Sequence, residues 1–162
     1  MLSNLRQTAL GMLSRIDWLG PLLARLTVGV VFAQSGWGKL HNLEKVTEFF
    51  GSIGIPYPEL QAPFVAGVEL VGGVLIAVGL LSRLAAVPLT ITMIVAILTA
   101  LRDQIEGVGD LLGLVEFAYI ALFVWIAIAG PGAVSLDALL VRFLSQGSER
   151  SAKPAQVRAA TL

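Results

Sequence analysis

The chain contains no cysteine and only one histidine, His41. Without cysteine there can be no disulfide, thiolate metal site, iron–sulfur cluster or cysteine nucleophile. One histidine cannot provide both axial ligands of a bis-histidine haem. His41 also lies just after an apolar run, where an exposed loop residue is a simpler interpretation than a metal ligand. No flavin motif is recognisable either, so the sequence predicts no metal, haem or flavin site in this chain.

Charged residues are also scarce. They make up 14% of the 162 residues, whereas 56% of the residues are hydrophobic. Soluble domains usually carry about 25% charged residues. The eleven acidic and eleven basic residues balance, so no overall positive field points to nucleic acid as a partner. This composition indicates a membrane protein whose main partner is the lipid bilayer.

Four apolar runs are long enough to cross a membrane, which takes roughly 17–25 residues in a helix. Pro21 and Pro63 fall at first-turn positions of two runs, and Pro131 with Gly132 closes the last one. Strands are excluded by the length of the runs and by the lack of the alternation of a closed barrel. The sequence predicts an all-α, integral membrane four-helix bundle over residues 20–146. Its spans are residues 20–38, 63–81, 84–101 and 111–130.

The segments that flank the spans are amphipathic or polar. Within residues 1–19 one helical face is apolar, which predicts an amphipathic helix lying at the membrane interface. This face consists of Leu2, Leu5, Ala9, Met12, Leu13 and Ile16. Leu136, Leu139, Leu140 and Phe143 repeat this pattern after the fourth span, with Ser135 as a plausible N-cap. Residues 147–162 are polar and rich in Ala and Ser, which predicts a disordered cytoplasmic tail.

Few ionisable residues interrupt the apolar runs. Such residues are costly inside a bilayer and normally face the bundle interior, paired with another group. The first span runs outward and places Lys39, with the polar Gln34, in its outer third. Glu69 and Glu116 lie roughly 9 Å and 8 Å from the outer ends of their own runs, at about 1.5 Å per residue. We therefore expect one lysine and two acids to share the outer half of the bundle, with Arg25 near its inner end.

Small residues accompany these charges. Arg25, Gly29, Phe32, Gly36 and Lys39 recur every three or four residues on the first span. Gly72 and Gly73 follow Glu69 on the second span with the same rhythm. Glycine lets a neighbouring helix backbone approach closely. The faces would suit an oligomer contact as well, but we predict that they meet inside the protomer, between the first two spans.

Three stretches resemble the DoxX family of small membrane proteins. "RLTVGVVFAQSGWGKL" (residues 25–40) matches the family's Arg-through-Gly-to-Lys-Leu pattern, and "VELVGGVLIAVGLLSRLAA" (residues 68–86) looks like its second span. "GPGAVSLDALL" (residues 130–140) is similar to its closing segment, and Glu116 stands where the family has an acid. The resemblance implies a four-helix bundle in the bacterial cytoplasmic membrane. In several relatives this bundle is tied to quinone-linked redox enzymes, as a subunit or a partner.

The same resemblance implies a ligand for the polar residues. A quinone head group would contact Lys39, Glu69 and Glu116, with Gln34 as a neutral donor and Trp37 as a flat apolar wall. Each residue also has a simpler interpretation: Lys39 and Glu69 as a structural ion pair, Glu116 as a further hydrogen-bonding group and Trp37 as an interfacial residue. For Arg25 we favour a lipid phosphate contact or a structural charge over a ligand role.

Three classes of function remain open. The first is a membrane subunit of, or partner to, a quinone-linked oxidoreductase. The second is a structural or assembly protein whose polar cluster only holds the bundle together. The third, a small-molecule or proton transporter, is disfavoured because four helices without inverted repeats or broken helices are unlike secondary transporters. Co-purification of quinone or redox subunits would favour the first class over the second.

The distribution of basic residues predicts that both termini are cytoplasmic. Reporter fusions at Gln61 and after Leu144 should therefore report opposite sides of the membrane, with the C-terminal reporter in the cytoplasm. Both reporters on the same side would overturn the topology. One side carries seven basic residues, Arg6, Arg15, Arg83, Arg142, Arg150, Lys153 and Arg158, and the other carries three, Lys39, Lys45 and Arg102.

Overall fold

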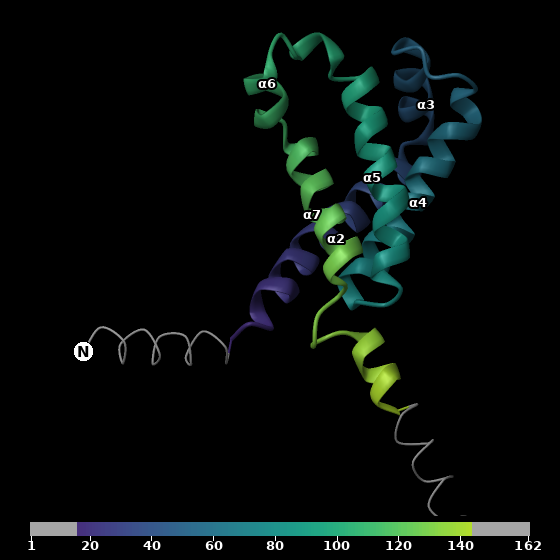
Figure 1. The fold of residues 1–162 in the computed structure, drawn as a ribbon. Helices are drawn as coiled ribbons and strands as arrows, with labels where there is room; N and C mark the ends of the chain where they lie inside the picture. The colour runs from purple at the N-terminus through teal and green to yellow at the C-terminus, as the bar shows by residue number, and fades with distance from the viewer. Residues whose placement is uncertain (1–15, 144–162) are drawn as a thin grey trace, which may run out of the picture.

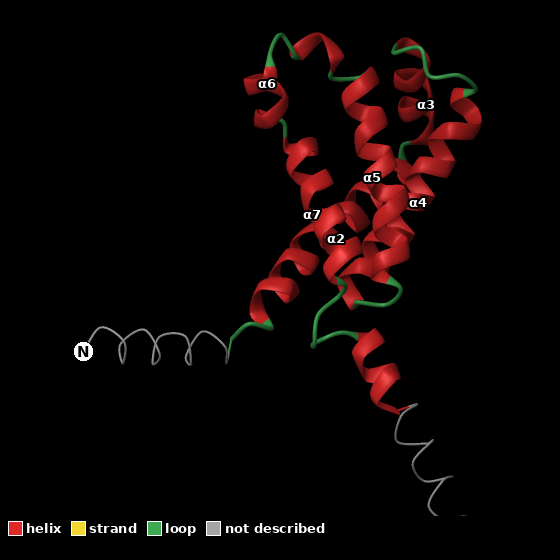
Figure 2. Cartoon of the chain, viewed as in Figure 1, coloured by secondary structure: helices red, strands yellow, loops and turns green. Residues whose placement is uncertain are grey.

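The computed structural model describes residues 16–143, which are helical through most of their length (Figures 1 and 2). No strand occurs in this part of the chain. Most of the helix expected at residues 1–19, and the tail at 147–162, lie outside the described residues. In chain order the elements are α2 (Leu19–His41), α3 (Leu43–Ser52), α4 (Pro58–Val78), α5 (Ser82–Thr99), the 3-10 turn η1 (Arg102–Gln104), α6 (Val108–Gly113) and α7 (Val115–Ala129), and residues 136–143 are helical as well.

Three of these helices, α2, α4 and α5, are long and apolar enough to cross a membrane. The fourth apolar run is shorter than the sequence predicted. It was expected to be continuous from residue 111, but Leu114 is extended (φ −71°, ψ 135°) and separates α6 from the 15-residue α7. Gly109 and Gly113 lower the helix propensity of the stretch before the break. At about 1.5 Å per residue α7 is roughly 22 Å long, so the bundle has three long helices and a short fourth.

Helices α2 and α4 make the most extensive contact in the bundle. Glycine allows this contact, because a Cβ added at Gly29, Gly36 or Gly73 would meet the backbone of the other helix at less than 3.0 Å. The structure therefore confirms the interior position predicted for these three glycines. Gly72 is different, since it faces the Leu89 side chain of α5. Its neighbour Gly73 meets α2 instead because successive helical residues are about 100° apart.

A mixed aliphatic and aromatic core joins the α2–α4 pair to α5 and α7. Phe32 of α2 packs edge-on against Phe123 and Tyr119 of α7, with ring centroids 4.8 Å and 5.2 Å apart. Ile76 of α4 and Leu89 of α5 are completely buried in the same cluster. The residues of this core come from α2, α4, α5 and α7, and α3 and α6 lie at the end of the bundle opposite the segment that follows α7 (Figure 1).

Helix α3 was missed from the sequence, where the residues between the first two spans were treated as an outer loop. It is a short amphipathic helix that places Val46 and Phe50 toward the bundle and Glu44, Lys45 and Glu48 on its exposed side. It packs against α4, and Phe50 is buried by this contact. The spacing of its apolar residues was the available signal. Because α3 covers the end of the α4–α5 pair, it forms part of the candidate site.

The glycine contact between α2 and α4 gives a direct test. Replacing Gly73 with Leu should unfold or strongly destabilise the monomer, by about 3 kcal/mol or more, because the new side chain would collide with the α2 backbone. Thermal melting and size-exclusion chromatography in mild detergent would measure this. Gly38→Leu is the matched control, since a Cβ at Gly38 meets nothing within 4 Å. If the Gly73→Leu variant instead folds as an intact monomer and only fails to form an oligomer, Gly73 lies at an external interface.

Candidate functional site

The site is built around the carboxylate of Glu69, which α4 carries into its contact with α2. The Glu69 side chain is only 2% exposed. One carboxylate oxygen, Oε1, pairs with the ammonium group of Lys39. The other, Oε2, accepts a hydrogen bond of 2.9 Å from the hydroxyl of Ser35. Both partners come from α2, and both carboxylate oxygens are hydrogen-bonded.

The helical geometry of α2 explains why two of its residues reach the same carboxylate. Ser35 and Lys39 are four residues apart and therefore lie on one face, one turn above the other. Gly36 lies beside them and meets the backbone of α4 at Leu70 and Ala66. The close approach brings α2 near enough for the short Ser35 side chain to reach Glu69. Since burying an unpaired carboxylate is costly, this contact makes the position of Glu69 tolerable.

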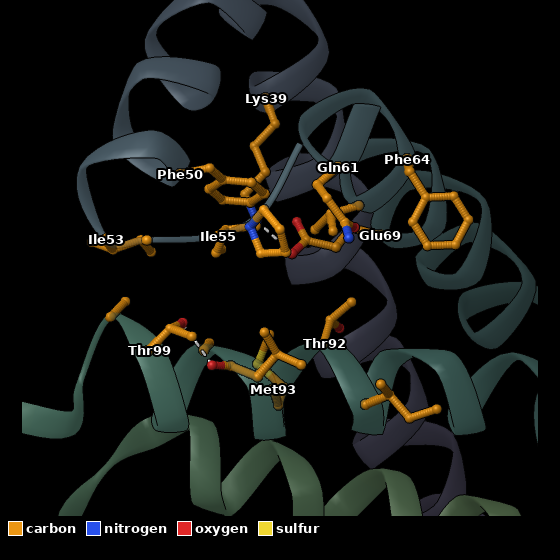
Figure 3. A pocket seen from close by; sticks show the side chains of 17 residues that line it. Lys39, Phe50, Ile53, Ile55, Gln61, Phe64, Glu69, Thr92, Met93 and Thr99 are labelled. Carbon is orange, nitrogen blue, oxygen red and sulfur yellow. Dashed lines mark hydrogen bonds and ion pairs between the residues drawn. The ribbon is translucent and has the colours of Figure 1, made fainter. Parts of the chain in front are cut away.

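Next to the ion pair lies a cavity of about 310 Å³ between α3, α4 and α5. Figure 3 shows Lys39, Phe50, Gln61 and Glu69 on one side of it and Thr92, Met93 and Thr99 of α5 on the opposite side. The loop at residues 53–56, which follows α3, completes the wall. Most of the lining is apolar, and among the described residues Lys39 and Glu69 are the only charged ones that line this cavity.

Lys39 is the charged group that is better placed to meet a ligand. Its side chain is 30% exposed, against 2% for Glu69. An ammonium group has three hydrogen-bond donors, and within residues 16–143 Lys39 uses one of them, on Glu69. The hydroxyls of Thr92 and Thr99 donate to the carbonyls of Leu89 and Val95, so they can offer only acceptor lone pairs to the cavity. The arrangement suits a mostly apolar molecule that carries a hydrogen-bond acceptor.

The structure does not bring the other expected ligand residues into this site. Gln34 is exposed on α2, and Trp37 is 59% exposed with its ring against His41, at a centroid distance of 4.3 Å. Neither lines the cavity. Gln34 and Trp37 are only one or two residues from Ser35 and Gly36 in the sequence. Because successive residues of a helix point about 100° apart, their side chains are turned away from α4.

Glu116 is likewise outside the cavity lining. It lies in the first turn of α7, and its side chain makes no hydrogen bond or ion pair with any residue in 16–143. A carboxylate in the first turn is stabilised by the helix dipole. The expected cluster of one lysine and two acids is therefore reduced to Lys39 and Glu69. Ser35, Phe50 and Gln61 are neighbours that the sequence did not single out.

Arg25 lies away from the cavity, toward the opposite end of α2. Its side chain is buried, and its guanidinium donates hydrogen bonds of 2.8 Å and 2.6 Å to the carbonyls of Pro131 and Val134. Gly79, with a positive φ of 74°, leaves the space that the guanidinium fills. Of the two roles expected for Arg25, this geometry corresponds to the structural charge, because the side chain ties α2 to the segment after α7.

No cluster of metal-ligating side chains accompanies the site. Across residues 16–143 no group of three or more histidine or acidic side chains lies close enough together to hold a metal ion. What the site itself presents is an ammonium group, paired with Glu69, in mostly apolar surroundings.

Comparison with known proteins identifies the family. The profile of the DoxX family matches residues 20–102, a region that includes α2, α3, α4 and α5 with the whole of the cavity. The chain belongs to the DoxX family. This DoxX protein is an integral membrane protein, in agreement with its apolar helices. No solved structure matches it.

Three relatives cover most of the chain. "Putative oxidoreductase CatD" of Bacillus subtilis (strain 168) is 33% identical over 80% of this chain and 93% of its own length. "Inner membrane protein YqjF" of Escherichia coli (strain K12) is 30% identical over 79% of this chain and 97% of its own length. "Inner membrane protein YphA" of the same strain is 29% identical over 72% of this chain and 86% of its own length. Their matched regions thus correspond to nearly the whole of each relative.

The ion pair should contribute measurably to stability. Replacing Lys39 with Met leaves the Glu69 carboxylate unpaired in an apolar setting, and should lower the free energy of unfolding by about 3 kcal/mol. Adding Glu69→Gln should restore most of the loss, because the amide is uncharged and its oxygen can still accept from Ser35. Thermal or denaturant unfolding in detergent would measure both changes.

Lys45→Met is the matched control for this double-mutant cycle, because it removes an exposed lysine of α3. It should change stability by no more than about 0.5 kcal/mol. A Lys39→Met protein as stable as the unmodified chain would show that the pair does not stabilise the α2–α4 contact.

Proposed function

We propose that this DoxX protein is a membrane subunit of, or a partner to, a quinone-linked oxidoreductase, and that it binds a quinone head group in the cavity beside Lys39. The observation that carries the proposal is the Lys39 ammonium group, held by Glu69 at the wall of an otherwise largely apolar cavity of about 310 Å³. Pockets of roughly 300–1,000 Å³ with a few convergent polar groups are typical of small-molecule sites.

A quinone ring matches the chemistry of this cavity. The ring is flat, neutral and largely apolar, and its carbonyl oxygens are hydrogen-bond acceptors. Lys39 would donate to one carbonyl through an ammonium proton that Glu69 does not use, while Phe50 and Met93 would pack against the ring. Glu69 and Ser35 would hold the ammonium in place and would not touch the ligand themselves.

The chain's part in the reaction would be binding and positioning. Electrons would pass between the quinone and a redox-active partner protein, because no metal, haem or flavin motif is present in this sequence. The name of the Bacillus subtilis relative contains the word oxidoreductase. By analogy, we propose that the present chain also works with a redox enzyme. The names of the two Escherichia coli relatives support a location in the bacterial inner membrane. The distribution of basic residues favours cytoplasmic termini.

A purely structural role is the main alternative, and one observation favours it. Both oxygens of Glu69 are already hydrogen-bonded by Ser35 and Lys39, so the pair could serve only to join α2 to α4. In that case the cavity would be a packing defect filled by lipid. Transport gains less support, because within residues 16–143 the Lys39–Glu69 pair makes no contact with Glu116 or with any other ionisable side chain.

Ligand binding separates these alternatives. The full chain in lipid nanodiscs should bind 2,3-dimethoxy-5-methyl-6-decyl-1,4-benzoquinone saturably. Lys39→Met with Glu69→Gln should weaken that binding about tenfold or more, since a hydrogen bond from a charged donor is worth roughly 1.5–3 kcal/mol. The double variant is used because its stability should be close to that of the unmodified chain.

Lys45→Met should bind the quinone normally, which controls for the loss of a positive charge at the same end of the bundle. A double variant that is stable and binds quinone as tightly as the unmodified chain would leave only the structural role. Purification in mild detergent would add an independent readout, since endogenous quinone or redox subunits should co-elute with the unmodified protein.

A further inference from the structure

A second hollow continues from the cavity along the outside of the bundle. It is a groove of about 360 Å³ between α4 and α5. Phe64 of α4 lines both the cavity and the groove, so the two adjoin at this residue. From Phe64 the groove follows α4 through Gly67 and Val71 to Leu75, on a face of the helix that does not include Glu69.

The shape of the groove follows from small residues on both helices. Gly67 and Gly72 of α4 face Ala85 and Pro88 of α5 across it. A Cβ built at Gly67 would meet no atom within 4 Å, so the hollow there is open and not filled by a neighbouring side chain. The α4–α5 contact is also less extensive than the α2–α4 contact. Every residue that lines the groove is apolar.

The two hollows therefore differ in chemistry although they adjoin. The cavity presents Lys39, Gln61 and two threonine hydroxyls, whereas the groove presents only hydrocarbon and backbone. Phe64 at the junction is 63% exposed, and Ile91 and Val95 on the α5 side of the cavity are 55% and 42% exposed. In a bilayer these exposed residues contact lipid, so a molecule can reach the cavity sideways from the membrane.

We propose that the groove holds the hydrocarbon tail of the molecule whose carbonyl head group lies beside Lys39. This inference rests on the proposed function and narrows the ligand to one with a polar carbonyl head and a linear hydrocarbon tail, such as an isoprenoid quinone. The head occupies the cavity, the tail passes Phe64, and its first units lie along the stripe from Gly67 to Leu75. A tailless head group binds through the cavity alone.

Two probes with matched head groups test this assignment. The tailed probe is 2,3-dimethoxy-5-methyl-6-decyl-1,4-benzoquinone, and the tailless probe is 2,3-dimethoxy-5,6-dimethyl-1,4-benzoquinone. Affinities are measured for the full chain in nanodiscs and expressed as the ratio of tailed to tailless binding. Partition of the tail into the bilayer is the same for every variant, so it cancels when these ratios are compared.

Gly67→Leu should place a side chain in the groove, because a Cβ at this position meets no atom within 4 Å. It should weaken binding of the tailed probe about tenfold, the scale of steric overpacking in a fitted site, and change binding of the tailless probe less than about twofold. Val71→Phe enlarges a different residue of the groove and should lower the ratio in the same direction. Gly38→Leu is the control, because it adds the same side chain at an open, exposed position of α2 and should leave the ratio unchanged.

Several results would overturn the groove assignment while leaving the cavity intact. An unchanged ratio in both groove variants, with Lys39-dependent binding preserved, would mean that only bilayer lipid occupies the groove. Equal weakening of both probes would mean that Gly67 acts on the head-group cavity itself. Loss of an oligomer without a change in the ratio would assign the groove to a second copy of the chain. If the unmodified chain binds neither probe, the proposed function fails, and the groove assignment fails with it.

Discussion

The Glu69 carboxylate lies within an apolar helix pair and must find its hydrogen-bond partners inside the protein. A buried charge of this kind is tolerated only when it is paired and hydrogen-bonded. Ser35 and Lys39 meet that requirement, and both depend on the close approach of α2 at Gly36. The glycine contact, the ion pair and the direction of the Lys39 side chain are thus consequences of one constraint.

The same constraint explains why a site forms at this place. Beside the α2–α4 contact a cavity remains between Glu69 and α5, and Phe50 of α3 with the loop at residues 53–56 completes its wall (Figure 3). The resulting cavity is apolar except where Lys39 and a few neutral polar groups reach its wall. At the other end of α2, Arg25 ties this helix to the segment after α7 by hydrogen bonds to the backbone carbonyls of Pro131 and Val134. Arg25 and Lys39 therefore have separate roles.

Much of this arrangement could be predicted from the sequence, because helical periodicity fixes which residues share a face. Gly29, Gly36 and Lys39 were placed on one face of α2, and Gly73 on the facing side of α4. Periodicity within one helix does not fix the angle at which another helix packs. For that reason Gly72 was predicted to face α2 although it faces α5, and Glu116 was predicted beside Lys39 and Glu69 although it does not line their cavity. Trp37 was expected either as a flat wall for a quinone or as an interfacial residue, and it is exposed and does not line the cavity. The amphipathic pattern of α3 was overlooked among longer apolar runs. Ser35 was missed because a hydroxyl in an apolar helix is a weak signal until its acceptor is located.

The central claim is that the Lys39 ammonium group donates a hydrogen bond to a quinone carbonyl. Infrared difference spectroscopy of a bound decyl quinone with ¹³C-labelled carbonyls measures this interaction directly, because hydrogen bonding lowers the C=O stretching frequency. The account predicts a lowered frequency for one of the two carbonyls in the unmodified protein and its return toward the free value when Lys39 is replaced by Met together with Glu69→Gln. Identical carbonyl frequencies for the bound and the membrane-dissolved quinone would contradict the account.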